Sequence, residues 1–172
     1  MAQERAKAVT LKGNPFTLVG PELKVGDAAP DFTAADGDLK PVSRSGLKGV
    51  TVLLSVPSLD TPVCDAEARR FNKEAAGLPG VSVVLVSVDL PFAQKRYCGA
   101  AGIDKVRVLS DYKDRSFGAA YGVFIKELAL LARAVFVVGE NGKLTYVQYV
   151  KEVAEQPDFD KLLGHLRQAA KV

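Results

Sequence analysis

The chain has 172 residues, of which 48% are apolar and 25% charged, a composition typical of a soluble globular protein. Its net charge of +3 comes from scattered basic and acidic residues rather than a basic block, which argues against nucleic-acid binding. The N-terminus has no apolar stretch typical of a secretory signal, and no apolar run reaches the roughly 20 residues of a membrane span. We therefore expect a cytoplasmic protein, one domain over residues 1–172, without a membrane partner.

The first elements in chain order are short. Residues 8–12 and 15–19 alternate apolar and polar side chains around a Lys-Gly-Asn turn, a pattern that predicts a β-hairpin. A loop rich in Gly, Pro and Asp follows, and we expect one short strand in it near Phe32.

The middle of the chain alternates between strands and helices. Residues 50–56 and 81–88 are continuous β-branched runs, which favour strands covered on both faces. Residues 65–78 have the apolar spacing of an amphipathic helix, and residues 91–102, with a proline at the first turn, predict a shorter one.

The last elements complete an α/β pattern. We expect a third strand over residues 106–111, a short helix or turn over 115–122, a hairpin over 132–150 and an amphipathic helix over 157–172. This order predicts an α/β sandwich with a central mixed sheet and flanking helices.

The stretch PSLDTPVCDAEARRFN, residues 57–72, places a thiol where the first buried strand gives way to a helix. Functional groups of open α/β sheets gather at the carboxyl ends of strands. Unpaired N–H groups at a helix N-terminus favour a thiolate, which is the nucleophilic form of cysteine. Cys64 is therefore a candidate nucleophile.

The charges around this thiol conflict. Asp65 and Glu67 would repel a thiolate, so the site needs a cation. The candidates are the Arg69–Arg70 pair, one to two turns along the helix, and Arg133, which lies in an apolar segment at the start of a predicted strand. A buried arginine is rarely unpaired, and its planar fork can hold an anion with two hydrogen bonds.

Each of these residues also has a structural interpretation. A lone cysteine is most often a small buried apolar residue, and a buried arginine usually pairs with a structural carboxylate. Thr61 and Pro57 by themselves are ordinary loop residues. Physical reasoning on the residues alone makes Cys64 a candidate and no more.

The spacing Pro57-x-x-x-Thr61-x-x-Cys64 resembles the active-site motif of peroxiredoxins. Together with VDLPFAQKRYCGAAGI, residues 88–103, it resembles the thiol peroxidase subgroup, the atypical two-cysteine peroxiredoxins of bacteria. The similarity runs from about residue 8 to the C-terminal helix. It implies a thioredoxin-like fold that carries the N-terminal hairpin.

The resemblance also implies a peroxidase without metal, haem or flavin. Cys64 would be the peroxidatic cysteine, whose thiolate attacks a hydroperoxide and becomes a sulfenic acid. Cys98 would be the resolving cysteine, which forms an intramolecular disulfide with Cys64, and thioredoxin would be the reductant. The family usually forms homodimers.

By the same resemblance three further residues complete the site. Arg133 would stabilise the thiolate and the charge that develops on the leaving oxygen, Thr61 would fix the line of attack, and Pro57 would shield the pocket. Bridged cysteines need Cα atoms within about 7 Å. Because Cys64 and Cys98 lie on different predicted helices, we expect the turn around Cys64 to unwind and the Cys98 segment to shift.

Other classes of protein remain open. A thioredoxin-type oxidoreductase would normally carry a second thiol three residues after Cys64, which this chain lacks. A scaffold with an inert disulfide and a redox sensor that oxidises a partner are further alternatives. Two cysteines and the single, distant His165 do not give zinc-ligand spacing, and we expect His165 to be a half-exposed helix residue rather than a general base.

Overall fold

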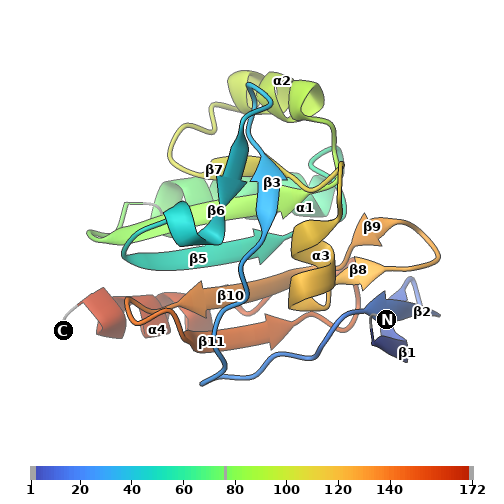
Figure 1. Cartoon of the computed structure of the whole chain (residues 1–172). Coiled ribbons are helices and arrows are strands. Elements are labelled where there is room, and N and C mark those ends of the chain that lie inside the picture. Colours follow the sequence, from blue (N-terminus) through green and yellow to red (C-terminus); the bar gives the residue numbers. More distant parts are fainter. Residues whose placement is uncertain (1–2, 76, 171–172) are drawn as a thin grey trace.

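The computed structural model describes residues 3–75 and 77–170, and it is an α/β sandwich (Figure 1). The strands are β1 Glu4–Leu11, β2 Asn14–Val19, β3 Thr33–Ala35, β4 Pro41–Ser43, β5 Val50–Ser55, β6 Val81–Ser87, β7 Arg107–Ser110, β8 Phe124–Ile125, β9 Leu130–Leu131, β10 Ala134–Val138 and β11 Leu144–Tyr149. The helices are α1 Pro62–Arg70, α2 Pro91–Ala101, α3 Ser116–Tyr121 and α4 Phe159–Ala170. Among these described helices, none is long and apolar enough to cross a membrane.

A mixed sheet of seven strands forms the centre, in the order β11-β10-β5-β6-β7-β3-β4. β5, β6 and β7 are parallel, whereas β10 runs antiparallel to β5. The continuous apolar runs in β5, β6 and β10 suit this position because both faces of the strands are covered. The predicted α/β sandwich with a central mixed sheet is therefore confirmed.

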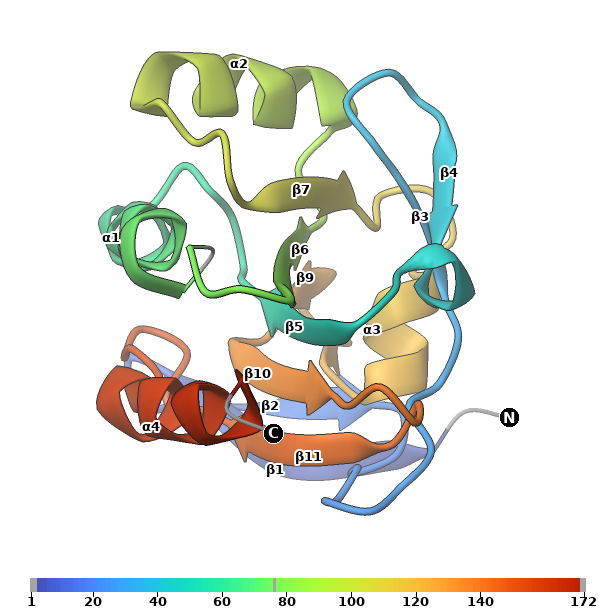
Figure 2. The ribbon, with the colours of Figure 1, turned by 90° about the vertical axis from the view of Figure 1, so that its left-hand side faces the viewer.

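Helices cover the two faces of the sheet unequally. α1 and α4 lie together on one face, and α3 lies on the other (Figure 2). The apolar cluster under α1 and α4 includes Phe71 and Phe159, whose rings meet edge to face at 4.8 Å, and it also contains Cys64. The cluster on the other face is built around Phe117 and Tyr121 of α3 and the hairpin residues that pack there. The candidate nucleophile thus lies in the layer between α1 and the sheet.

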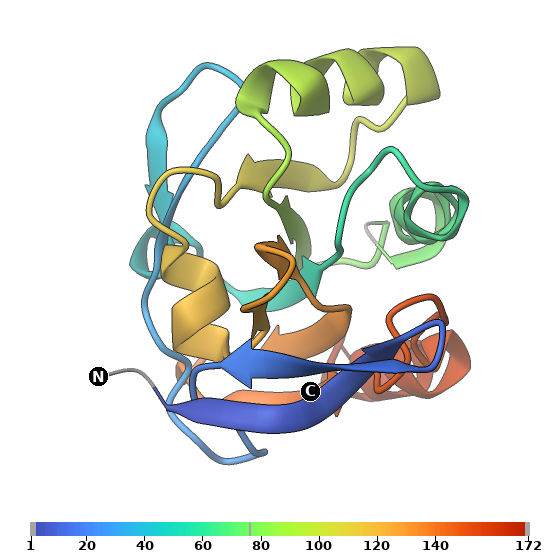
Figure 3. The same cartoon turned by 90° about the vertical axis from the view of Figure 1, so that its right-hand side faces the viewer.

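The predicted N-terminal hairpin is confirmed, and it packs along the β11 side of the molecule (Figure 3). Lys12 and Gly13 form its turn with φ of 51° and 83°, as a two-residue hairpin turn requires. β1 starts at Glu4, earlier than predicted, because a register shift between Arg5 and Val9 hides the simple alternation of the strand.

The helix expected over residues 65–78 begins earlier and changes character. α1 starts at Pro62 because Thr61 caps it and proline suits the first helical position. After Arg70 the chain continues as a π-helical turn, Phe71–Ala75. Cys64 therefore lies inside the first turn of the helix.

Short elements account for the remaining differences. β4, β8 and β9 have two or three residues each, too few to show a periodicity. α4 begins at Phe159 rather than at Pro157, because the Asp158 carboxylate accepts a hydrogen bond from Lys161 N (3.1 Å) and caps the helix. The last two residues of the range predicted for α4, 171–172, lie outside the described residues.

We predict that Gly122→Ala destabilises the fold strongly. Gly122 has φ +67°, and a Cβ there would lie 1.9 Å from the carbonyl oxygen of Pro21. The free energy of unfolding, measured by denaturant titration, should fall by about 3 kcal/mol or more because backbone must move. Gly142→Ala is the control: its φ is +78°, no described heavy atom lies within 4 Å of the added Cβ, and the loss should be about 1 kcal/mol. Equal losses would contradict this explanation.

Candidate active site

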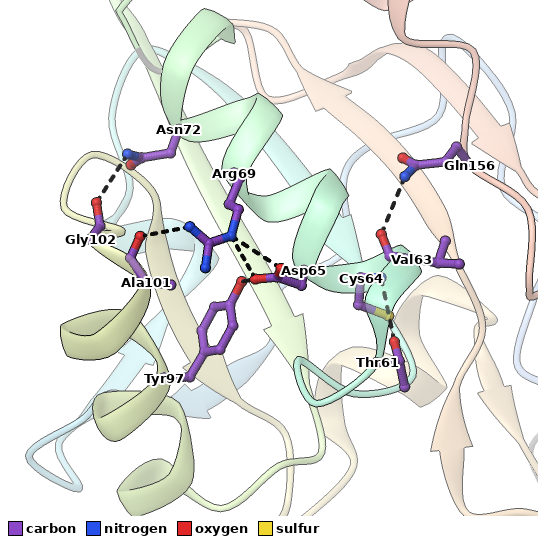
Figure 4. Close-up of polar contacts among 10 residues, drawn as sticks. All are labelled: Thr61, Val63, Cys64, Asp65, Arg69, Asn72, Tyr97, Ala101, Gly102 and Gln156. Carbon is purple, nitrogen blue, oxygen red and sulfur yellow. Dashed lines mark hydrogen bonds and ion pairs between the residues drawn. The ribbon is translucent and has the colours of Figure 1, made fainter.

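Cys64 is the third residue of α1 and is fully buried. Its N–H donates to Thr61 Oγ1 (3.4 Å; Figure 4), and the Thr61 hydroxyl donates to the carbonyl of Ser58 (3.1 Å). Thr61 thereby connects the first helical turn to the loop that leads into it. The sulfur lies where the backbone dipoles of the helix favour a negative charge.

Arg133 directly precedes β10 and brings the cation to this sulfur. Its Nη2 lies 3.2 Å from Cys64 Sγ, its Nη1 donates to Glu67 Oε2, and its Nε donates to the carbonyl of Val153 (3.1 Å). The side chain is only 2% exposed. A guanidinium held on three sides in a dry site interacts with a thiolate far more strongly than one in water.

Glu67 shares Arg133 with the sulfur and is itself 1% exposed. Burial raises the pKa of Glu67 to about 7, although the positive charge of Arg133 acts in the opposite direction. Its second oxygen, Oε1, has no hydrogen-bond partner among the described residues. The sequence marked Glu67 only as a repelling charge; the spacing i, i+3 from Cys64 on one helix face was the signal that the two side chains share an environment.

The other two candidate cations point elsewhere. Arg69 binds the Asp65 carboxylate at 2.9 Å, and Arg70 binds Asp160 at 3.2 Å and stacks on the ring of Phe159. Asp65 is thus drawn to Arg69 and away from the sulfur. Of the three arginines singled out in the sequence, the structure brings Arg133 to Cys64.

The loop between β5 and α1 is fixed by a carboxylate that the sequence analysis missed. Asp89, just after β6, accepts hydrogen bonds from Ser58 Oγ (2.7 Å), Leu59 N (2.8 Å) and Ser87 Oγ (2.7 Å). Pro57 is buried at the start of this loop. The position of Asp89 at the carboxyl end of the next parallel strand was the only sequence signal for it.

Cys98 lies on α2 and is half-buried, with its thiol pKa raised by burial. Both cysteines are free, and Cys98 packs against the same apolar cluster that contains Cys64. Two residues anchor α2: Gln94 donates to the carbonyl of Leu109 (2.8 Å), and Asn72 of the π-helical turn donates to the carbonyl of Gly102 (3.4 Å).

His165 is far from this chemistry. It is half-exposed on α4, as expected, and its Nε2 shares a hydrogen bond with Thr145 Oγ1 at 2.9 Å. Within residues 3–75 and 77–170, no group of three or more His, Cys, Asp or Glu side chains is arranged to hold a metal ion.

Comparisons with known proteins agree on one family. Residues 24–163 match the sequence profile of the Redoxin family. The thiol peroxidase of Halalkalibacterium halodurans is 57% identical over 157 residues, which cover 91% of this chain and 95% of that protein. The thiol peroxidase of Bacillus subtilis is 58% identical over 154 residues, with coverages of 89% and 92%.

The chain belongs to the Redoxin family. Within the family its relatives place it in the thiol peroxidase subgroup of the peroxiredoxins, the subgroup that the sequence motifs resemble. A crystal structure of a peroxiredoxin-like protein from Aquifex aeolicus superposes with a TM-score of 0.89 at 48% identity, covering 95% of this chain and 98% of that one. The thiol peroxidase from Chromobacterium violaceum, 20% identical with a TM-score of 0.83, shares the fold. The predicted thioredoxin-like fold of the redoxins is therefore confirmed.

For this redoxin, we predict that Glu67→Gln changes how stability depends on pH. The folded state raises the Glu67 pKa from 4.5 to about 7, so it binds the proton more tightly than the unfolded chain does. Ionised Glu67 therefore destabilises the fold progressively as the pH rises from about 4.5 to about 7. Glutamine lacks this titration. The stability of the variant relative to wild type should grow by about 3 kcal/mol across that window, measured by denaturant unfolding at several pH values.

The matched control is Glu74→Gln, which alters an exposed glutamate of the adjoining π-helical turn. Its stability should follow the wild-type pH profile. Parallel profiles for Glu67→Gln and wild type would show that burial does not perturb Glu67.

Proposed function

We propose that the protein is a thiol-dependent peroxidase whose nucleophile is Cys64 and whose substrates are hydrogen peroxide and organic hydroperoxides. The observation that carries the assignment is the contact of 3.2 Å between Arg133 Nη2 and Cys64 Sγ in a buried helix N-terminus. This arrangement favours a sulfur anion without any histidine base. The names of the close relatives support the same activity.

The first step oxidises Cys64. The thiolate attacks one oxygen of ROOH, the O–O bond breaks, and the sulfur becomes a sulfenic acid while the leaving oxygen takes a proton and departs as ROH. Arg133 stabilises the thiolate before the attack and the charge on the departing oxygen during it.

Thr61 and Pro57 position the reactants in this proposal. The Thr61 side chain lies beside the helix turn of Cys64, where its oxygen can interact with the peroxide and orient the attack along the O–O axis. Pro57 is buried at the base of the same loop and keeps water out. No metal, haem or flavin is needed, since the sulfur carries both electrons.

The second step joins the two cysteines. The Cys98 thiol attacks the sulfenic sulfur, a Cys64–Cys98 disulfide forms and water leaves. Because Cys64 Sγ is buried against Arg133 whereas Cys98 lies on another helix, the first turn of α1 has to open. Thioredoxin, a dithiol reductant, would then return both cysteines to thiols.

The remaining proposals concern setting and assembly. The resemblance to bacterial thiol peroxidases supports a cytoplasmic enzyme that works as a homodimer, with residues 1–172 acting as one domain and neither nucleic acid nor membrane as partner. A sensor role, in which the oxidised enzyme passes its disulfide to another protein, uses the same Cys64 chemistry and is compatible with this activity.

Substitution of each cysteine tests the two steps separately. With a thioredoxin system, Cys64→Ser should consume no peroxide because the nucleophile is gone. Cys98→Ser should lose thioredoxin-driven turnover but still reduce about one equivalent of peroxide per chain, measured in a single-turnover assay. Equal peroxide consumption by wild type and both variants would show that neither cysteine is needed, and it would favour the scaffold interpretation over the peroxidase.

Arg133→Lys tests the cation. An ammonium cannot reach Sγ, Glu67 and the Val153 carbonyl in one plane, so we expect kcat/KM for peroxide to fall by about 100- to 1000-fold. Arg69→Lys is the matched control and should change this value by less than about threefold, because Arg69 binds Asp65 on the exposed side of the helix. Retained activity in Arg133→Lys would move the cation role to another residue.

A further inference from the structure

We propose that Asp65 and Tyr97 are positioning residues for the second step: their hydrogen bond latches the turn that carries Cys64, and the opening of this latch sets how fast the sulfenic acid meets Cys98. The inference rests on the proposed function and adds a control over its conformational step. It follows from where the two residues lie in the sequence and in space. Asp65 directly follows Cys64, and Tyr97 directly precedes Cys98.

The latch is a compact set of polar contacts between α1 and α2. The Tyr97 hydroxyl donates to Asp65 Oδ1 at 2.5 Å. Arg69 donates from Nε to the same oxygen at 2.9 Å and from Nη1 to the carbonyl of Ala101 at 3.3 Å. A carboxylate that accepts from both a phenol and a guanidinium forms charge-assisted bonds, which are stronger than neutral ones.

The contacts of Asp65 and the sulfur of Cys64 lie on different sides of α1. Figure 4 shows Asp65 and Arg69 on the face of α1 turned toward Tyr97, whereas the side chain of Cys64 points away from Tyr97. Cys64 Sγ is held on that other side by Arg133. To reach a cysteine on α2 the first turn must rotate or unwind, and this movement displaces Asp65 from Tyr97.

The π-helical turn that follows α1 provides a fixed base for this movement. Asn72 accepts hydrogen bonds from Lys105 N (2.7 Å) and Val106 N (3.1 Å) and donates to the carbonyl of Gly102 (3.4 Å). Its side chain also donates to Asp104 Oδ1 (3.2 Å), and Asn72 lies about two turns from Cys64. The helix is thus anchored at Asn72 and closed at Asp65, so opening can be confined to its first turn.

The strength of the latch suits a step that must be reversible. The hydrogen bond from Tyr97, followed by Arg69, lowers the pKa of Asp65, so the carboxylate stays ionised at neutral pH. Burial and the contact with Asp65 raise the pKa of Tyr97, which keeps its proton available for donation. The Asp65 side chain is 35% exposed and that of Arg69 54%, so water can replace the contacts when the turn opens.

The latch would determine the fate of the sulfenic acid. In the open form, the sulfenic acid of Cys64 condenses with the Cys98 thiol, and one disulfide and one water result. In the closed form, the sulfenate can attack a second ROOH, which yields a sulfinate and ROH. A longer-lived latch therefore favours the sulfinate, and a weaker one favours the disulfide.

Tyr97→Phe tests this inference because it removes the hydroxyl and retains the ring. Stopped-flow oxidation of the reduced protein by peroxide should give an unchanged first phase, within about twofold, since Cys64 and Arg133 are untouched. The second phase, disulfide formation, should be about 3- to 10-fold faster. The fraction of Cys64 converted to sulfinate at high peroxide, measured by mass spectrometry, should fall by a similar factor. Asp65→Asn, which keeps an oxygen acceptor for Tyr97 but weakens the hold of Arg69, should give a smaller acceleration.

The control is Lys95→Gln, which breaks an ion pair of α2 with Asp38 (3.0 Å) and leaves α1 alone. Both phases should match wild type. If Tyr97→Phe forms the disulfide at the wild-type rate or more slowly, the latch is disproved even though the peroxidase stands. If wild-type Cys64 is not oxidised by peroxide at all, the proposed function fails first, and the two results are distinguishable in the same experiment.

Discussion

The placement of one guanidinium between a sulfur and a carboxylate constrains the rest of this site. Arg133 is almost completely buried, and removal of its charge from water is expensive unless nearby groups compensate. Cys64 Sγ and Glu67 of α1 and the Val153 carbonyl after β11 supply that compensation from two separate segments. The same contacts that make the arginine tolerable also hold it against the sulfur, so stability and chemistry depend on one set of atoms.

The sharing of Arg133 has an electrostatic consequence. If Glu67 and Cys64 were both ionised, one cation would face two anions in a dry environment. The raised pKa of Glu67 eases this competition, because near neutrality part of the population holds Glu67 protonated and leaves the positive charge to the sulfur. Glu67 Oε1, which has no hydrogen-bond partner within the described part of the chain, is the structural sign of the same compromise.

The sequence was sufficient to predict the long strands and helices of the fold, but it was insufficient for the short strands that join them. The β-branched runs of β5 and β6 and the apolar stripe of α4 are long enough to show their period, and each was predicted to within a few residues. β8 and β9 were not, because two residues carry no period.

The residues of the site also fall into those that the sequence could indicate and those that it could not. Cys64 stands out from its position at the start of a helix, but its contact with Arg133 spans 69 positions of the chain, and the choice among three arginines depended on which one the sheet order brings beside β5. Glu67 and Asp89 were missed as partners because nothing local distinguishes them from solvated carboxylates.

The two ends of α2 are tied down: Gln94 binds the Leu109 carbonyl at one end, and Asn72 binds the Gly102 carbonyl at the other. Cys98 lies between these two attachments, so in the proposed second step the shift of its segment would be small, and most of the movement would fall to the short stretch around residue 64. The conformational entropy cost of bringing two segments together is lower when one of them moves than when both move freely. Under this proposal the cross-link between α1 and α2 would require only a short, repeatable movement of one helical turn, while most of the sandwich keeps its structure from one catalytic cycle to the next.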